Sequence, residues 1–308
     1  MATQHSRLPN LTDFDIRLLR VFHAVVQSKG FAAAQDKLGL TQSTISIQIA
    51  QLEGRLNVRL CERGRKGFYL TEEGRMVYEA SLSLFRAVES FRGLVGSALG
   101  QLVGEMHFGI VDALVTNPEI DLDKALRAFA DVAPDVELHI DVSSPQELIQ
   151  GLIEEHYHAI LTPVSRQHSS IKYRSAFKEQ QTLYCGQDHP LFDRPASGIS
   201  VDDLSNIAYS ARAYMLDWTP PLELELQPKG MASHMESIAL MILSGRFIGY
   251  LPTHYASNWV TADKMRPLLK EQLSYDEQFY VCSRKAEPSR VAQAFLRCIE
   301  EHMCNGGA

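Results

Sequence analysis

An amphipathic pattern at residues 42–56 is the clearest feature of the chain. Its apolar side chains recur at intervals of four, three and four residues, which places them on one face of an α-helix; they are Ile45, Ile49, Leu52 and Leu56. The opposite face carries short hydroxyl and amide side chains and almost no charge. Thr41 stands where an N-cap belongs, because its hydroxyl can accept a hydrogen bond from the free amides of the first turn.

A shorter helical pattern precedes this one. Residues 31–38 hold three alanines and end at Leu38, and Gly39 can adopt the positive φ that terminates a helix. Two helices joined by such a turn form a helix-turn-helix, whose second helix enters the major groove of DNA. Glutamine can form two hydrogen bonds with an adenine edge, and serine or threonine can bond either kind of base. The alternative is a helical hairpin that only packs, with its polar residues facing solvent.

The flanking segments complete a small domain. A first helix is predicted from Asp13 or Asp15 to about Lys29. After residue 56, short strands are predicted around Leu60 and at residues 68–70, with a basic tip between them. This pattern favours a wing, which can reach phosphates or the minor groove; the alternative is a solvated turn. The candidate DNA contacts are Thr41, Gln42, Ser43, Thr44, Ser46 and Gln48 in the second helix, with Arg63, Arg65 and Lys66 in the wing.

A long helix is predicted from residue 72 to about residue 98. Thr71 is its N-cap, and the two glutamates after it suit the positive end of the helix dipole. A near-heptad seam runs along it, formed by Val77, Leu84, Val88, Phe91, Val95 and Ala98. This seam favours a dimerising helix over a helix buried in its own domain, and two-fold pairing would present two reading helices to a dyad-symmetric DNA site.

Beyond Gly104 the pattern changes to alternating strands and helices. Strands are predicted at 106–111, 136–142, 158–164, about 172–177, 182–186, 207–210, 247–251 and 277–283, and helices at 118–132, 145–155, 234–243 and 289–303, with a helix-like turn at 202–206. Such alternation indicates a mostly parallel α/β domain. Residues 105–163 and 201–252 each show strand–helix units, so two lobes separated by a cleft are expected.

The stretch from Ala32 to Arg75 resembles the winged helix-turn-helix of the LysR-type transcriptional regulators. The positions in register with the family pattern are Ala33, Ala34, Leu38, Thr41, Gln42, Ile45, Ser46, Ile49, Leu52, Glu53, Leu56, Leu60, Arg63, Leu70, Thr71 and Gly74. Two departures precede the wing, where Asn57 replaces the usual glycine and Cys61 the usual Phe or Leu. They concern the packing of the wing more than DNA binding.

The resemblance implies three parts and an assembly. These are a winged helix-turn-helix at residues 1–71, a dimerising linker helix at 72–100, and an effector-binding domain at 101–308 with the two-lobed α/β fold of periplasmic binding proteins. It implies a regulator that binds dyad-symmetric double-stranded DNA, forms dimers through the linker helix and tetramers in addition, and responds to a small-molecule co-inducer, with no other cofactor. Within the wing, it assigns Arg65 or Lys66 to the minor groove and a partly structural role to Arg63.

Charge and composition agree with a DNA-binding N-terminus. Residues 1–75 hold 11 Lys and Arg against 7 Asp and Glu, whereas the whole chain of 308 residues carries a net charge of −7. The basic segment is expected to be the part that meets phosphates. Five scattered cysteines, no apolar run of membrane length and no signal-peptide core predict a cytoplasmic protein with no membrane partner.

Ligand-binding residues are expected where strands of the α/β domain end. In open α/β sheets, ligands bind beyond the carboxyl ends of strands and often against helix N-termini. The candidates are Asp112, Thr116, Thr162, Ser210, Arg212, His234 and Tyr250, and the family's effector contacts fall in the same loops. Arg212 and His234 together would favour a carboxylate or another anion, although ordinary loop packing accounts for any single one of these residues.

Other chemistries have weaker signals. The chain has no phosphate-binding loop, dinucleotide fingerprint, zinc-protease or nucleophile-elbow motif, so an enzyme is not expected. His156 and His158 beside Glu154 and Glu155 are typical of a charged helix end rather than of a metal site. Cys185 resembles the position of a redox thiol in some family members, but it has no neighbouring cysteine, so core packing is the simpler interpretation. Control by redox state or by a protein partner is the alternative to a small ligand.

Overall fold

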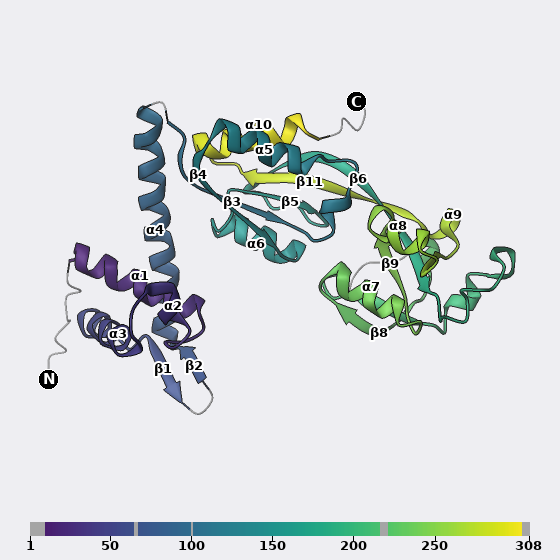
Figure 1. Cartoon of the computed structure of the whole chain (residues 1–308), viewed down its shortest axis with the longest axis horizontal. Helices are drawn as coiled ribbons and strands as arrows, with labels where there is room; N and C mark the ends of the chain where they lie inside the picture. The colour runs from purple at the N-terminus through teal and green to yellow at the C-terminus, as the bar shows by residue number, and fades with distance from the viewer. Residues whose placement is uncertain (1–9, 65–66, 100, 216–220, 304–308) are drawn as a thin grey trace. The chain divides into compact units, whose positions relative to one another are not determined.

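The computed structural model describes residues 10–64, 67–99, 101–215 and 221–303, which form two compact units, residues 1–91 and 92–308 (Figure 1). Each unit has its own hydrophobic core, and each is considered by itself below. No helix in the described ranges combines the length and the apolar character that crossing a membrane requires.

The first unit has the predicted order of helices and strands. Its elements are α1 (Asp13–Gln27), α2 (Ala34–Leu38), α3 (Gln42–Leu56), β1 (Cys61–Gly64), β2 (Gly67–Leu70) and the start of α4 (Glu72–Ala98). β1 and β2 form an antiparallel hairpin, as expected for a wing. The helix predicted at residues 31–38 begins three residues later, as α2, because residues 31–33 form a turn.

Both departures from the family pattern fit the structure. Asn57 ends α3 in the left-handed conformation, with φ of 54°, where glycine is usual and asparagine is the best tolerated replacement. Cys61 is buried in the same core as Phe22, Ile49 and Leu60. The packing before the wing therefore accepts both residues.

The second unit is built on one mixed sheet rather than a mostly parallel one. Its strands follow the order β4 (Asp135–Val142), β3 (Val103–Ile110), β5 (Ala159–Pro163), β11 (Tyr275–Arg284), β6 (Ile171–Gly186), β9 (Ile248–Pro252), β7 (Ala208–Arg212) and β8 (Gln227–Ala232), with β10 (Met265–Pro267) paired to β6. The strands at either end of this order are parallel to their neighbours, whereas β6 and β11 run antiparallel to each other and to the strands beside them.

The two ends of the sheet carry separate cores, which define two lobes. In the first lobe, α5 (Leu122–Val132) and α10 (Arg290–Glu301) lie on one face of the sheet and α6 (Pro145–Ile153) on the other (Figure 1). The second lobe holds α7 (Met235–Leu243), α8 (Thr253–Thr261) and α9 (Lys270–Leu273). The short 3-10 turns of this unit are Leu114–Thr116, Ala196–Gly198, Asp202–Leu204 and Pro221–Glu223.

Two strands, β6 and β11, pass from one lobe to the other and are called the crossing strands. β6 contributes Phe177 to the core of the first lobe and Leu183 to that of the second, and β11 does the same with Val281 and Tyr275. The sequence pattern divided β6 into two strands, because residues 178–181 are all polar. That division is wrong: these residues keep their pairing with β11 while the chain crosses between the cores.

Candidate DNA-reading surface and regulatory cleft

The exposed face of α3 carries uncharged polar side chains that the sequence assigned to base reading, together with Ile47, which is 60% exposed. Gln42 and Ser43 are exposed, and Thr44, Ser46 and Gln48 are half-buried along the same helix. Thr41 caps the helix, since its hydroxyl accepts from the Thr44 amide at 3.3 Å. The opposite face is buried against α1. The first turns of α3 therefore present amide and hydroxyl groups outward from a fixed helix, as major-groove reading requires.

An ion pair fixes α3 against α1. Arg55, in the last turn of α3, donates to both carboxylate oxygens of Asp15, whose side chain is only 3% exposed. Asp15 also accepts from the Thr12 amide at 2.8 Å in a capping box. The hydrogen bond from Arg55 and those from Thr12 hold the pKa of Asp15 far below its ordinary value, against the opposing effect of burial. The sequence did not assign a role to this pair, because its members lie 40 residues apart.

The wing is anchored at its base. Glu53 accepts from the Leu60 amide at 2.8 Å, while the Leu60 carbonyl accepts from the Thr71 amide at 3.1 Å. Arg63 lies in β1, opposite Phe68 in the register of the hairpin. Arg65 and Lys66, the other predicted wing residues, lie outside the described residues.

The long helix α4 leaves large apolar side chains in solvent. Phe91 is 66% exposed and Val95 is 45% exposed, both on the predicted seam, and Met76 is 65% exposed. Val77 and Leu84, earlier on the seam, instead pack against the core of the first unit. The seam is thus partly buried in its first half and open in its second.

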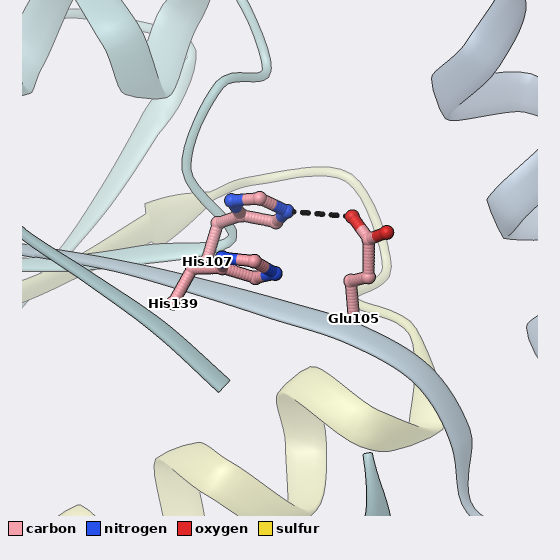
Figure 2. Close-up of side chains that lie close together, drawn as sticks. All are labelled: Glu105, His107 and His139. Atoms are coloured by element: carbon pink, nitrogen blue, oxygen red, sulfur yellow. Dashed lines mark hydrogen bonds and ion pairs between the residues drawn. The ribbon is translucent and has the colours of Figure 1, made fainter. Parts of the chain in front are cut away.

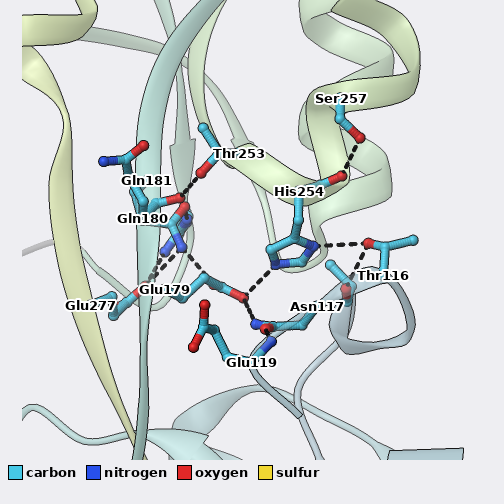
Figure 3. Close-up of polar contacts among 12 residues, drawn as sticks. Thr116, Asn117, Glu119, Glu179, Gln180, Gln181, Thr253, His254, Ser257 and Glu277 are labelled. Carbon is cyan, nitrogen blue, oxygen red and sulfur yellow. Dashed lines mark hydrogen bonds and ion pairs between the residues drawn. The ribbon is translucent and has the colours of Figure 1, made fainter. Parts of the chain in front are cut away.

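In the second unit, a chain of mostly buried polar contacts joins the lobes; we call it the interlobe polar cluster. Six of its members are labelled in Figure 3, namely Thr116, Asn117, Glu179, Gln181, His254 and Glu277. Arg212 is the seventh, through its bonds to Gln181 and Glu277. Glu179, on a crossing strand and 4% exposed, accepts from Asn117 of the first lobe at 2.9 Å and bonds His254 of the second at 2.8 Å. Thr116 and His254 also bond directly, at 2.9 Å.

Arg212 is the charged centre of this cluster. Its side chain is 4% exposed and donates to Glu277 at 2.9 Å and to Oε1 of the Gln181 side chain at 2.5 Å. Its Nε is enclosed and bonds no other described residue. Because Glu277 balances its charge, Arg212 holds the crossing strands to β7 rather than offering a free positive charge to a ligand.

A second set of contacts closes the space between the N-termini of α6 and α7. Asp112 follows β3 in the first lobe, and its carboxylate accepts from the backbone amide of Met235, the first residue of α7 in the second lobe. His234 is half-exposed, with its Nδ1 3.8 Å from the same carboxylate. From α6, Gln146 donates to the Tyr214 carbonyl at 2.7 Å. We call these contacts the cleft latch.

The cleft latch is partly desolvated. Burial raises the pKa of Asp112, and the Met235 amide and His234 offset that rise in part. Burial also raises the pKa of Tyr214 to about 12, with Arg212 acting in the opposite direction. A carboxylate, an imidazole and the N-termini of two helices thus lie together where the two lobes meet.

The remaining predicted effector residues lie in the interior. Thr162 is fully buried on β5, and its hydroxyl donates to the Pro163 carbonyl. Ser210 is buried and donates to the Met241 sulfur, and Tyr250 donates to the Leu273 carbonyl within the second lobe. Their polar groups are occupied by neighbours inside the lobes, so we leave these three out of the proposed effector site.

A cavity of about 820 Å³ opens next to the interlobe polar cluster. Its lining consists of residues 117–119, 175–180, 253–254, 276 and 278. It contains none of the seven candidates named above, but its lining includes Asn117, in the same predicted loop as Thr116. The sequence pattern missed this region because α8, which carries Thr253 and His254, was not predicted.

Neither the Cys185 thiol nor the pair His156 and His158 is arranged for redox sensing or metal binding. The thiol of Cys185 is fully buried and burial raises its pKa to about 11, opposite to the change that makes a thiol reactive. His156 is exposed and pairs loosely with Glu154, whereas the His158 ring accepts from the His107 backbone amide at 3.0 Å. The two histidines therefore do not share a site.

Comparison with known proteins covers both units. Residues 16–75 match the family model described as bacterial regulatory helix-turn-helix protein, lysR family, and residues 100–304 match the LysR substrate binding domain. The chain is 40% identical over 303 residues to the HTH-type transcriptional activator BauR of Pseudomonas aeruginosa, which covers 96% of this chain and 98% of that protein.

More distant relatives share parts of the chain or its fold. A probable hydrogen peroxide-inducible genes activator of Mycobacterium xenopi is 30% identical over 173 residues, covering 56% of this chain and 90% of that protein. The crystal structure of full-length CbnR in complex with its target DNA has a TM-score of 0.64 at 17% identity, covering 94% of this chain and 99% of that one. The latter likeness concerns the fold.

Proposed function

The chain belongs to the LysR family of DNA-binding transcriptional regulators, and we propose that a small molecule bound between the lobes of its second unit controls it. Proteins of this family regulate transcription rather than catalyse a reaction. The observation that carries the proposal is the cleft latch, where Asp112 of one lobe caps α7 of the other. We place the protein in the cytoplasm, with its DNA.

We assign base reading to the start of α3. Gln42 and Ser43 are its exposed polar residues, and Thr44, Ser46 and Gln48 follow on the same helix. Thr41 is engaged in capping, which positions the first turn. Arg63, Arg65 and Lys66 are assigned to the DNA backbone or minor groove, because basic side chains at a hairpin tip suit the negative potential there.

Gln42→Ala and Lys66→Ala should change DNA binding in different ways. Removing the Gln42 amide is expected to cost about 1–3 kcal/mol of discrimination at one base pair, since both hydrogen bonds to that base are lost. Removing Lys66 should weaken binding to every sequence and lower the salt slope of binding by about one. Fluorescence anisotropy on operator variants at several salt concentrations measures both effects.

Lys270→Ala is the matched control for the lysine variant. Lys270 is exposed in α9 of the second unit, so its loss changes the net charge equally without touching the proposed DNA surface. It should leave the salt slope unchanged. Parent-like binding by both Gln42→Ala and Lys66→Ala would rule out this docking.

Assembly through α4 follows from its open seam. Phe91 and Val95 expose apolar surface that a second copy of the helix would bury. LysR regulators form oligomers, and we propose a dimer through α4, with dimers pairing into tetramers. Two copies of α3 would then meet a dyad-symmetric DNA site.

The effector is proposed to act on the cleft latch. A ligand shifts a conformational equilibrium only by binding one state more tightly than the other. A molecule that fits between the N-termini of α6 and α7 must either add to the Asp112–Met235 contact or replace it. Either action changes the stability of the arrangement in which the cleft latch joins the two lobes. Because Glu277 already balances Arg212, His234 is the accessible member of the pair expected to favour an anion.

A ligand screen on the full chain tests this proposal. Both tryptophans lie in residues 92–308, so tryptophan fluorescence follows unfolding of the second unit. An effector at about 100 times its Kd should add about 2.7 kcal/mol, a rise in melting temperature of at least about 5 °C. The panel contains aromatic and aliphatic acids, amino acids and sugars.

Two variants locate the site of any molecule that gives a shift. Asp112→Ala should abolish the shift, because it removes the centre of the cleft latch. Glu119→Ala, which alters the lining of the 820 Å³ cavity, should preserve it. The reverse result would move the effector to that cavity, and no shift with any compound would favour control by a protein partner. Redox control has little support, because the described thiols, Cys61, Cys185, Cys282 and Cys298, are all buried.

A further inference from the structure

Two copies of the sequence Glu-x-His lie side by side on neighbouring strands. β3 carries Glu105 and His107, and β4 carries Glu137 and His139. In the parallel register of these strands, Glu105 is opposite Glu137 and His107 is opposite His139. Alternate residues of a strand share one face, so the four side chains form a two-by-two array on the sheet. That face is opposite to the one where Met106 and Phe108 enter the core.

The side chains of the array are close enough to share an ion. The imidazoles of His107 and His139 stack with their centroids 4.5 Å apart and their planes 6° apart (Figure 2). His107 Nε2 lies 2.8 Å from a carboxylate oxygen of Glu105. One ligand atom each from Glu105, His107 and His139 lies within 4.8 Å of the others, and Glu137 approaches His139 Nε2 to 3.2 Å.

A third imidazole, His158, contacts the array from the side of β3 that faces β5. His158 precedes β5 and accepts from the backbone amide of His107 at 3.0 Å, with the two rings 5.7 Å apart. His158 thus fixes the backbone of β3 at His107.

Protein groups alone leave a charge repulsion and an unmade hydrogen bond in this array. Like charges directly opposite each other on neighbouring strands are destabilising, and Glu105 faces Glu137 in this way. His139 Nε2 is shielded from solvent yet makes no hydrogen bond of acceptable geometry with any described residue. A divalent cation would remove both costs, because it neutralises the carboxylates and accepts the nitrogen lone pair.

We propose that Glu105, His107 and His139 bind one divalent transition-metal ion, with Glu137 available as a fourth ligand. Two imidazoles and a carboxylate suit Zn²⁺, Ni²⁺ or Co²⁺, whereas Mg²⁺ and Ca²⁺ prefer oxygen ligands alone. Ligand atoms of tetrahedral Zn²⁺ lie about 3.4 Å apart, so the partly exposed side chains move inward by about 1 Å on binding. The two imidazoles must also tilt out of their parallel stack, because each nitrogen lone pair lies in its ring plane.

This metal site is separate from the cleft latch, and a bound ion would stabilise the edge of the sheet. β4 is the outermost strand of the first lobe, next to β3, and an ion held by both strands ties this edge to the lobe. The regulator would then receive a metal signal in addition to its effector. Zn²⁺ at about 100 times its Kd should raise the melting temperature of the second unit by at least about 5 °C.

Metal titration of the tag-free, chelator-treated full chain tests the proposal. Calorimetry with Zn²⁺ and Ni²⁺ should give one site per chain, and Co²⁺ should produce a visible d–d absorption band as the ion enters a nitrogen and oxygen ligand set. The double variant His107→Gln/His139→Gln should bind at least about tenfold more weakly and lose the Co²⁺ band. The matched control His156→Gln/His168→Gln removes two imidazoles elsewhere and should behave like the parent.

Two outcomes would overturn the assignment. One is equal metal binding by the parent and the His107→Gln/His139→Gln variant, and the other is no binding by the parent. Glu105→Gln provides a second variant if the double substitution prevents folding: it keeps both imidazoles and should weaken binding while leaving the unfolding of the metal-free protein close to that of the parent.

Discussion

Gly74→Ala should unfold the DNA-binding unit or leave it severely destabilised. A Cβ at position 74 would lie 1.8 Å from the carbonyl oxygen of Leu60, far inside van der Waals contact. Leu60 cannot move away easily, because Glu53 binds its amide, Thr71 donates to its carbonyl, and its side chain is fully buried. We expect a loss of at least about 3 kcal/mol, or about 12 °C in melting temperature for a unit of this size.

Calorimetry and operator binding measure this effect, and the second unit provides an internal reference. Both tryptophans belong to residues 92–308, so the tryptophan unfolding transition should not change in Gly74→Ala. Gly54→Ala is the matched control, since Gly54 lies within α3 with no atom in reach of its added Cβ. That change should stabilise the unit by about 0.5–1 kcal/mol. Parent-like stability of Gly74→Ala would show that α4 does not press on Leu60.

Arg212→Met should strongly destabilise the second unit before any ligand is considered. The substitution keeps an apolar stem but leaves Glu277 and the Gln181 side-chain Oε1 without their buried partner. Breaking a buried ion pair on one side costs about 3–5 kcal/mol, because the remaining charge is uncompensated. Tryptophan fluorescence during thermal unfolding should show a fall of about 10 °C.

A second substitution separates charge from packing. Arg212→Met/Glu277→Gln removes both charges and should recover much of the lost stability, since a buried pair is worth little relative to neutral residues of similar volume. Arg194→Met, which breaks the more exposed pair with Asp203, should change stability little. If Arg212→Met unfolds like the parent but loses its response to effector, Arg212 acts on the ligand and not on the crossing strands.

Local features of the first unit follow from the sequence because they depend on neighbours a few residues apart. The capping of α3 by Thr41, the left-handed turn at Gly39 and the buried stripe of α3 each arise within one or two helical turns. The family resemblance added the effector-binding role of the α/β domain and the tetramer. Asn57 and Cys61, which departed from the family pattern, required the structure to show that a left-handed turn and a buried pocket accept them.

The sites of the second unit needed the tertiary structure. Residues 178–181 look like a loop because four polar residues interrupt an apolar pattern, yet β6 stays continuous while Glu179 and Gln181 form buried bonds with partners from both lobes. The repeated Glu-x-His sequence was visible in the chain, but only the parallel register of β3 and β4 brings the two copies together.

The sequence by itself determined the helix-turn-helix, the long linker helix and the alternating α/β pattern, since periodicity and capping are local properties of the chain. Only the tertiary structure decided which charges are already neutralised. Arg212 and Glu277 lie 65 residues apart, as Asp112 and Met235 lie 123 apart. Over such separations the contact depends on strand order and lobe packing, which no local pattern encodes.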